Sequence, residues 1–290
     1  MFANQSVNLD ILRARAYNLR WATVSEEVIP LTAADPDFPV AEPIREALIR
    51  YTKEGYFSYG PAEGLSSFRE SLAKRYFEKR SVDYDPSCIL AVDSAAAGIH
   101  LVCKTFLNKG DEAIIFDPVD FLFKYSIESV QAVAIPFATP QSNDLIDFSS
   151  LEMIITPRTK MICLCNPLNP TGKVFTKKEL RQLAFIAEKY NLIILSDEIW
   201  SDIVFKPHTY TSIANIDEAI KNRTIIVTGF SKSFGLASLR VGAVMAPNCE
   251  LYKKIFSTSL HSSTISGCNV PGQIAATVAM DSCDEWLSTF

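Results

Sequence analysis

Short apolar segments alternate with helical patterns along most of the chain, and this alternation is the feature that most restricts the fold. Seven apolar segments are predicted to be β-strands, near residues 89–92, 113–116, 132–136, 160–165, 192–196, 224–228 and 241–245. Helical patterns lie near residues 44–54, 65–79, 97–107, 177–190 and 250–258. Strands that alternate with helices form a mostly parallel sheet covered by helices on both faces. We therefore predict an α/β fold, a three-layer sandwich with a mostly parallel seven-stranded sheet.

Composition excludes several classes of protein. A chain of 290 residues with 48% hydrophobic content can bury a substantial core and is not typical of disordered proteins. A net charge of −5 provides no basic surface for nucleic acid or an anionic membrane, and no long apolar span or signal-peptide-like start occurs. We expect a cytoplasmic protein with neither kind of partner. No metal-ligand spacing occurs among the histidines and cysteines, and Cys163 and Cys165 are expected to be buried thiols on one strand face.

Polar residues follow three of the predicted strands. Asn169, Asp197 and Lys232 each come at or just after the end of a separate apolar segment. Any one of them alone is equally typical of an ordinary loop or helix cap, but open α/β sheets bind their ligands where the carboxyl ends of strands meet. An amine that forms a Schiff base, near Arg240 as a fixed cation for a phosphate, suits pyridoxal phosphate chemistry. No G-x-G-x-x-G or P-loop motif points to a nucleotide instead.

The order and spacing of these three residues carry a resemblance to a known family. The set Asn169, Asp197 and Lys232 resembles that of the class I/II aminotransferases, which belong to the fold type I pyridoxal-phosphate enzymes. The resemblance runs from about Leu31 to about Ala276. It implies a pyridoxal-phosphate-dependent aminotransferase, a homodimer that transfers an amino group between an amino acid and a 2-oxo acid.

The resemblance also implies roles for the central residues. Lys232 would carry the cofactor and, once released by substrate, move the Cα proton as general acid and base. Asp197 would face the pyridine nitrogen, where a carboxylate favours the protonated ring. Asn169 would donate to the phenolic oxygen of the ring and lie near the substrate. Arg240 would pair with the phosphate.

Further contacts follow from the same resemblance. Ser94, Ala95 and Ala96 begin a predicted helix, and backbone N–H groups at such a start bind anions such as the cofactor phosphate. Tyr59 would cross the dimer to the phosphate of the neighbouring subunit. Ala34 would lie near the substrate carboxylate.

Several positions depart from the family pattern. Trp200 stands where aminotransferases usually have a tyrosine, and an indole donates a hydrogen bond but accepts none. Together with the segment 34–39, Trp200 resembles the carbon–sulfur β-lyase branch, so a β-lyase acting on cystathionine-like substrates is the alternative. The family's ring-stacking aromatic falls on Asp120, and we assign the stacking role to Phe121, one position later. Gly229 replaces a serine that binds the phosphate in many relatives.

The predicted domains reflect where the chain stops. Phe290 lies inside an apparent helix, whereas family members continue into a C-terminal domain with the arginine that binds the substrate carboxylate. We predict an N-terminal arm and part of a small domain over residues 1–45 and a large cofactor-binding domain over residues 46–275. Residues 276–290 would start a linker helix to a C-terminal small domain that is largely absent, with an unpartnered apolar face. A truncated cofactor-binding remnant without turnover is therefore a second alternative.

Overall fold

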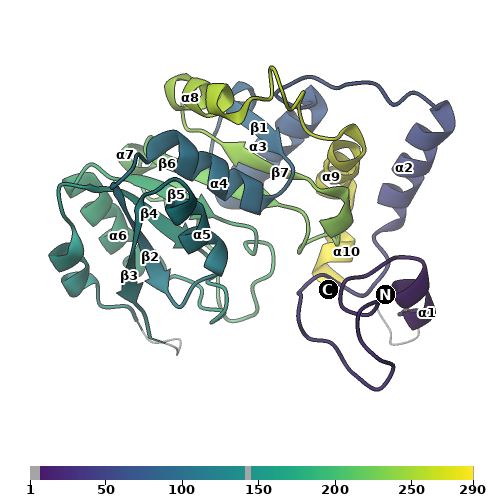
Figure 1. Cartoon of the computed structure of the whole chain (residues 1–290), viewed down its shortest axis with the longest axis horizontal. Helices are drawn as coiled ribbons and strands as arrows, with labels where there is room; N and C mark the ends of the chain where they lie inside the picture. Colours follow the sequence, from purple (N-terminus) through teal and green to yellow (C-terminus); the bar gives the residue numbers. More distant parts are fainter. Residues whose placement is uncertain (1–6, 141–144, 290) are drawn as a thin grey trace.

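All seven predicted strands form and build one sheet. The computed structural model describes residues 7–140 and 145–289 (Figure 1). The strands are β1 (Ile89–Val92), β2 (Glu112–Asp117), β3 (Val133–Ala138), β4 (Thr159–Cys165), β5 (Ile193–Asp197), β6 (Thr224–Gly229) and β7 (Gly242–Met245). Their order in the sheet is β1-β7-β6-β5-β4-β2-β3, and β7 runs antiparallel to β1 and β6 while every other neighbouring pair is parallel. The predicted α/β fold with a mostly parallel seven-stranded sheet is thus confirmed.

Helices cover both faces of this sheet. They are α1 (Leu9–Ala14), α2 (Glu42–Glu54), α3 (Ser66–Arg80), α4 (Ala95–Phe106), α5 (Phe121–Ser129), α6 (Lys177–Lys189), α7 (Glu218–Lys221), α8 (Cys249–Ser259), α9 (Val270–Ser282) and α10 (Asp284–Thr289). The five predicted helical segments correspond to α2, α3, α4, α6 and α8. Helix α5 was not predicted, and it begins where the Asp120 carboxylate accepts from the Leu122 N–H at 3.1 Å. Across the described residues, no helix combines the length and apolar character needed to cross a membrane.

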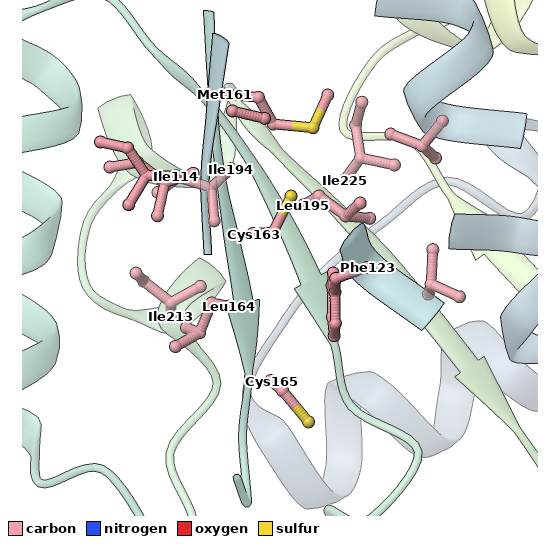
Figure 2. Packing of buried hydrophobic residues seen from close by; sticks show 14 of the residues in the cluster. Ile114, Phe123, Met161, Cys163, Leu164, Cys165, Ile194, Leu195, Ile213 and Ile225 are labelled. Atoms are coloured by element: carbon pink, nitrogen blue, oxygen red, sulfur yellow. The ribbon is translucent and has the colours of Figure 1, made fainter. Parts of the chain in front are cut away.

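Side chains of the central strands alternate between the two faces. In β4, Cys163 and Leu164 are both fully buried. Figure 2 shows Cys163 on the same side as Phe123 of α5, while Leu164 lies beside Ile213 on the other side. Cys165 shares the face of Cys163 because side chains two residues apart in a strand point the same way. Burial on both sides explains why β4 is a continuous apolar run in the sequence, and it confirms the expected burial of both thiols.

The C-terminal segment departs from the prediction of one helix over residues 276–290. Helix α9 ends at Ser282, and α10 begins at Asp284 after an interruption at Cys283. The Cys283 N–H still bonds to the Ala279 carbonyl at 3.2 Å, but the backbone of Cys283 has left the helical region. Two short helices therefore replace the expected single one, and Phe290 lies outside the described residues.

The expectation of an unpartnered apolar face on this segment is wrong. Ala276 and Ala279 are fully buried in a cluster that also contains residues of α2 and α3. The Trp286 ring of α10 stacks on Phe234, with 6.5 Å between ring centroids. Because Phe234 is only two residues from Lys232, α10 packs against the loop that carries the candidate catalytic lysine. Elements of the same chain therefore bury the α9 part of this face and partly cover Trp286 and Leu287.

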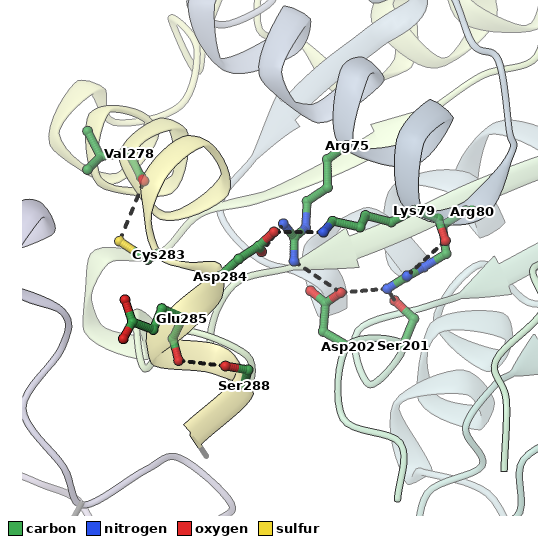
Figure 3. Close-up of polar contacts among 10 residues, drawn as sticks. All are labelled: Arg75, Lys79, Arg80, Ser201, Asp202, Val278, Cys283, Asp284, Glu285 and Ser288. Carbon is green, nitrogen blue, oxygen red and sulfur yellow. Dashed lines mark hydrogen bonds and ion pairs between the residues drawn. The ribbon is translucent and has the colours of Figure 1, made fainter. Parts of the chain in front are cut away.

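A polar network ties α3 to α10 and to the segment after β5 (Figure 3). Arg75 donates to Asp284 at 2.7 Å and to Asp202 at 3.3 Å, and Arg80 pairs with Asp202 at 2.5 Å. Lys79 pairs with Asp284 at 2.8 Å. The side chains of Arg75 and Arg80 are only 10% and 13% exposed, so both guanidinium groups need their carboxylate partners.

Replacing Asp202 should destabilise the fold much more than replacing Asp284. Asp202→Asn leaves the mostly buried Arg80 without its carboxylate and is expected to lower the free energy of unfolding by about 3 kcal/mol. Asp284→Asn should cost at most about 1 kcal/mol, because Asp284 is 48% exposed. Urea unfolding of both variants measures the difference. Equal losses would contradict the assignment of Asp202 as the centre of the network.

Candidate active site

One cavity lies where the carboxyl ends of β4, β5 and β6 meet the start of α4. Its volume is about 480 Å³. Nine predicted site residues line it: Ala34, Ser94, Ala95, Ala96, Asn169, Asp197, Trp200, Lys232 and Arg240. Tyr59 and Phe121 do not line it and are 91% and 75% exposed. The parallel sheet therefore gathers most of the predicted residues at one edge, as the argument from strand ends requires.

Strand register places the three central residues. Cys165 of β4 pairs with Asp197 of β5, and Asp197 pairs with Val227 of β6. Asp197 thus occupies the last paired position of a central strand, between two neighbours. Asn169 and Lys232 follow a few residues after those neighbouring strands, one on each side of Asp197. Their proximity is set by backbone pairing rather than by flexible loops.

Burial dominates the electrostatics of Asp197, which is 6% exposed. Burial raises the pKa of Asp197 to about 7, and the carboxylates of Asp120 and Glu198 act in the same direction. The Ile199 N–H, 3.1 Å from Asp197 Oδ1, opposes the shift. A positive charge facing the carboxylate would lower this pKa, so the site favours a cationic group at that place.

The raised pKa of Asp197 predicts a pH-dependent stability difference in the protein without a bound ligand. Below about pH 4 the carboxyl is protonated in both states and costs nothing, whereas above pH 7 it is ionised in both and the full penalty applies. Asp197→Asn cannot ionise. It should therefore gain stability over the parent chain by about 2.5 kcal/mol as pH rises from 5 to 7.5. Urea unfolding at several pH values measures this, and a pH-independent difference would contradict it.

Lys232 is half-buried beside Trp200. Its Nζ lies 5.4 Å from the centroid of the indole ring, within the range of a cation–π contact. Burial lowers the pKa of Lys232, while the carboxylates of Asp35 and Asp120 act against that shift. A lowered pKa enlarges the fraction of neutral amine, which is the form that attacks a carbonyl or accepts a proton.

The opposite wall of the cavity is suited to an anion. The Ser94 hydroxyl caps α4 by accepting from the Ala97 N–H at 3.1 Å. The N–H groups of Ala95 and Ala96 belong to the first turn, which has no intrahelical acceptor for them. The Arg240 side chain lines the same cavity. N–H groups at a helix start combined with a guanidinium are a suitable site for a phosphate.

Close packing behind this wall depends on Gly242. A Cβ at Gly242 would lie 2.8 Å from the Ser94 carbonyl carbon and 2.9 Å from the Ala95 nitrogen. Only glycine lets β7 approach the start of α4 so closely. Arg240 itself has a left-handed backbone with φ of 46°, and Asn269 Nδ2 donates to its carbonyl oxygen at 2.8 Å. The backbone just after Arg240 and the start of α4 are thus held against each other.

Asp120 is a cavity residue that was not assigned from the sequence. It lines the cavity, and its Oδ2 accepts from Asn169 Nδ2 at 2.9 Å. The stacking role expected of Phe121 does not agree with its position, since Phe121 begins α5 directly after the capping Asp120 and its side chain is exposed. The wall therefore presents a carboxylate rather than an aromatic ring. The signal was present in the sequence, since Asp120 follows the end of β2 just as Asn169 follows β4.

The segment that carries Ala34 is held by a buried arginine. Arg20, 6% exposed, donates to Asp37 Oδ1 at 2.6 Å and to the Asp35 carbonyl oxygen at 2.7 Å. Trp21 Nε1 donates to the same Asp37 oxygen at 2.9 Å. These bonds fix the segment over the cavity, where Ala34 forms part of the lining. No local sequence pattern marks Arg20, because its partners Asp35 and Asp37 lie 15 and 17 residues away and meet it only in the fold.

Comparison with known proteins is consistent with this geometry. Residues 26–288 match the family model described as aminotransferase class I and II. The chain belongs to this family. It is 32% identical over 271 residues to an aspartate aminotransferase of Bacillus sp. (strain YM-2), covering 91% of this chain and 68% of that protein. It is 30% identical over 241 residues to an aspartate aminotransferase of Geobacillus stearothermophilus, covering 82% of this chain and 61% of that protein.

Solved structures share the fold. Cystalysin from Treponema denticola, whose crystal structure contains a pyridoxal 5'-phosphate cofactor, superposes with a TM-score of 0.89 at 25% sequence identity. The match covers all of this chain and 75% of cystalysin. The chain spans about two thirds of the length of the two aspartate aminotransferases named above.

The residues of the cavity fit the cofactor that the family implies. Pyridoxal phosphate has an aldehyde, a ring nitrogen that can be protonated and a phosphate. The cavity has the amine of Lys232, the buried carboxylate of Asp197 and an anion-binding wall formed by the start of α4 with Arg240. A cation facing Asp197 would offset the raised pKa of its buried carboxyl, as a protonated ring nitrogen does. The close approach of β7 to the start of α4 at Gly242 also agrees with this assignment.

Proposed function

We propose that the protein is a pyridoxal-phosphate-dependent aminotransferase, which transfers an amino group between an amino acid and a 2-oxo acid. The observation that carries the proposal is the single cavity in which Lys232, Asp197 and the start of α4 meet. The names of the two curated relatives support it. A β-lyase suggested by Trp200, or a remnant without turnover, has no better support among these findings.

Each residue of the cavity has a physical role in this proposal. When bound, pyridoxal phosphate supplies an aldehyde that combines with amines and a ring that withdraws electron density from the substrate Cα–H bond. The Nζ of Lys232 accepts the Cα proton and returns a proton later, which its lowered pKa favours. Asp197 stabilises a positive charge on the ring nitrogen. Arg240 and the N–H groups at the start of α4 hold the phosphate.

Asn169 and Asp120 act as a pair. Their 2.9 Å hydrogen bond orients the Asn169 amide toward the cavity. The Asp120 carboxylate adds negative charge near Lys232 and Asp197. In this proposal Asn169 binds the cofactor ring and the substrate, while the segment around Ala34 holds the substrate at the mouth of the cavity.

Lys232 provides the direct test of the function. Purified protein incubated with pyridoxal phosphate and reduced with borohydride should carry a pyridoxyl group on Lys232, located by peptide mapping. Amino transfer from a panel of amino acids to 2-oxoglutarate should fall by at least 100-fold in Lys232→Ala, since an essential proton-transfer group is lost. Lys253→Ala, which changes an exposed lysine of α8, is the matched control. A label on another lysine would overturn the assignment.

We further propose that the protein is a homodimer in which Tyr59 completes the neighbouring site. Tyr56, Phe57 and Tyr59 are 79%, 66% and 91% exposed, a cluster of large side chains that a second copy would cover. Cytoplasmic location and the domain boundaries after residues 45 and 275 stay predictions from the sequence.

The dimer predicts an effect of Tyr59 on cofactor binding. Tyr59→Phe should weaken pyridoxal phosphate binding by roughly tenfold, because a hydrogen bond to a charged group is lost. Tyr56→Phe, a neighbouring exposed tyrosine, should leave binding unchanged. Fluorescence titration measures the affinity, and sedimentation velocity is expected to show a dimer. A monomer saturated with cofactor would contradict the proposal.

A further inference from the structure

Two thiols far apart in the sequence lie next to each other away from the cavity. Cys88 ends the short helix η2 (Pro86–Cys88) just before β1, and Cys249 is the first residue of α8. Their Sγ atoms are 3.4 Å apart, although 161 residues separate them in the chain. Cys88 is buried and Cys249 is exposed.

Backbone contacts hold these two cysteines together. The Ala246 N–H donates to the Cys88 carbonyl at 2.9 Å, which continues the antiparallel pairing of β1 with β7. Two residues later, Asn248 caps α8 by accepting from the Leu251 N–H at 3.0 Å. The short connection from β7 to α8 is therefore fixed at both ends. The closeness of the sulfurs follows from the sheet and the helix cap, not from one side-chain rotamer alone.

Access distinguishes this pair from the other cysteines. All seven cysteines lie in the described part of the chain, and Cys249 is the one that is exposed. Cys103 and Cys163 also interact with each other, but both are fully buried, so a dissolved oxidant does not reach them without local opening. A buried thiol beside an exposed one is an arrangement in which the exposed sulfur meets the oxidant and the buried one completes the bond.

We propose that Cys88 and Cys249 form a redox-responsive disulfide site whose oxidant is a small disulfide such as oxidised glutathione. The Cys249 thiolate attacks one glutathione sulfur, forming a mixed disulfide and releasing one glutathione. The Cys88 sulfur, after losing its proton to water, then attacks Cys249 Sγ and releases the second glutathione. Two protein thiols are oxidised and one glutathione disulfide is reduced to two thiols. The sulfurs must approach by about 1.4 Å to reach bonding distance, which rotation of the exposed Cys249 side chain supplies.

The bond would act on stability without touching the cavity. It would join the start of edge strand β1 to the first turn of α8. Ser94 and Arg240 lie near the other ends of β1 and β7, since Val92 pairs with Gly242. This inference does not depend on the proposed aminotransferase activity. Its variants also leave the cavity residues unchanged.

The test is a thiol count on the full chain treated with oxidised glutathione and then freed of it. Ellman's reagent in denaturant should find five thiols where the untreated protein has seven, because two are consumed. Non-reducing peptide mapping should join the peptides of Cys88 and Cys249. The melting temperature should rise by roughly 4–8 °C, since a disulfide that closes a long loop restricts the unfolded chain. Dithiothreitol should restore the count of seven thiols and the original melting temperature.

Variants separate this pair from general oxidation. Cys249→Ser changes the exposed residue and should keep six thiols after treatment, with no rise in melting temperature. Cys88→Ser keeps the exposed Cys249 but removes the thiol that displaces the second glutathione, so its six thiols should fall to five through a glutathione adduct on Cys249, again with no rise in melting temperature. Cys283→Ser is the matched control at another cysteine, and its six thiols should fall to four. An unchanged count of seven in the parent chain would overturn the proposal. So would a stable glutathione adduct on Cys249 of the parent chain, or a bond between two chains.

Discussion

Parallel backbone pairing of β4, β5 and β6 is the constraint on which the candidate site depends. The register places Asp197 level with Cys165 on one side and Val227 on the other. Whatever follows those strands must then lie at the same edge, which is how Asn169 and Lys232 reach one cavity. A one-residue slip would turn Asp197 to the other face of the sheet and separate it from Lys232.

Desolvation at this edge acts on both central groups. It raises the pKa of the Asp197 carboxyl and lowers the pKa of the Lys232 amine, so each group is shifted toward its neutral form. Such shifts are common at functional sites, because burial there is not fully compensated by the protein's own charges. A ligand that brings a positive charge to Asp197 and an anion to Arg240 would offset the cost of burying these charged groups, which the protein's own charges do not fully offset. This is why the donor set is more informative than any single residue.

The C-terminal helices α9 and α10 pack against elements that adjoin the cavity. α9 buries its alanines against α2 and α3, and α10 places Trp286 on Phe234 in the lysine loop. The pairing of Arg75 with Asp284 and Asp202 connects α10 to the segment that carries Trp200. The two helices are thus part of the packed fold and stabilise two segments that line the cavity.

The sequence by itself determined the strands, half of the described α-helices and nine of the residues that line the cavity. Buried parallel strands are continuous apolar runs, and the polar residues that end them are local features, so Asn169, Asp197 and Lys232 could be found without a structure. Three features were decided only by the tertiary structure. They are the position of Asp120 in the cavity wall, the hydrogen bonds from Arg20 to the segment that carries Ala34, and the burial of α9. Those features depend on contacts between residues distant in the chain, and neither periodicity nor spacing encodes which surfaces will meet. The proximity of Cys88 and Cys249 belongs to the same class, because a chain separation of 161 residues is bridged only when β1 pairs with β7.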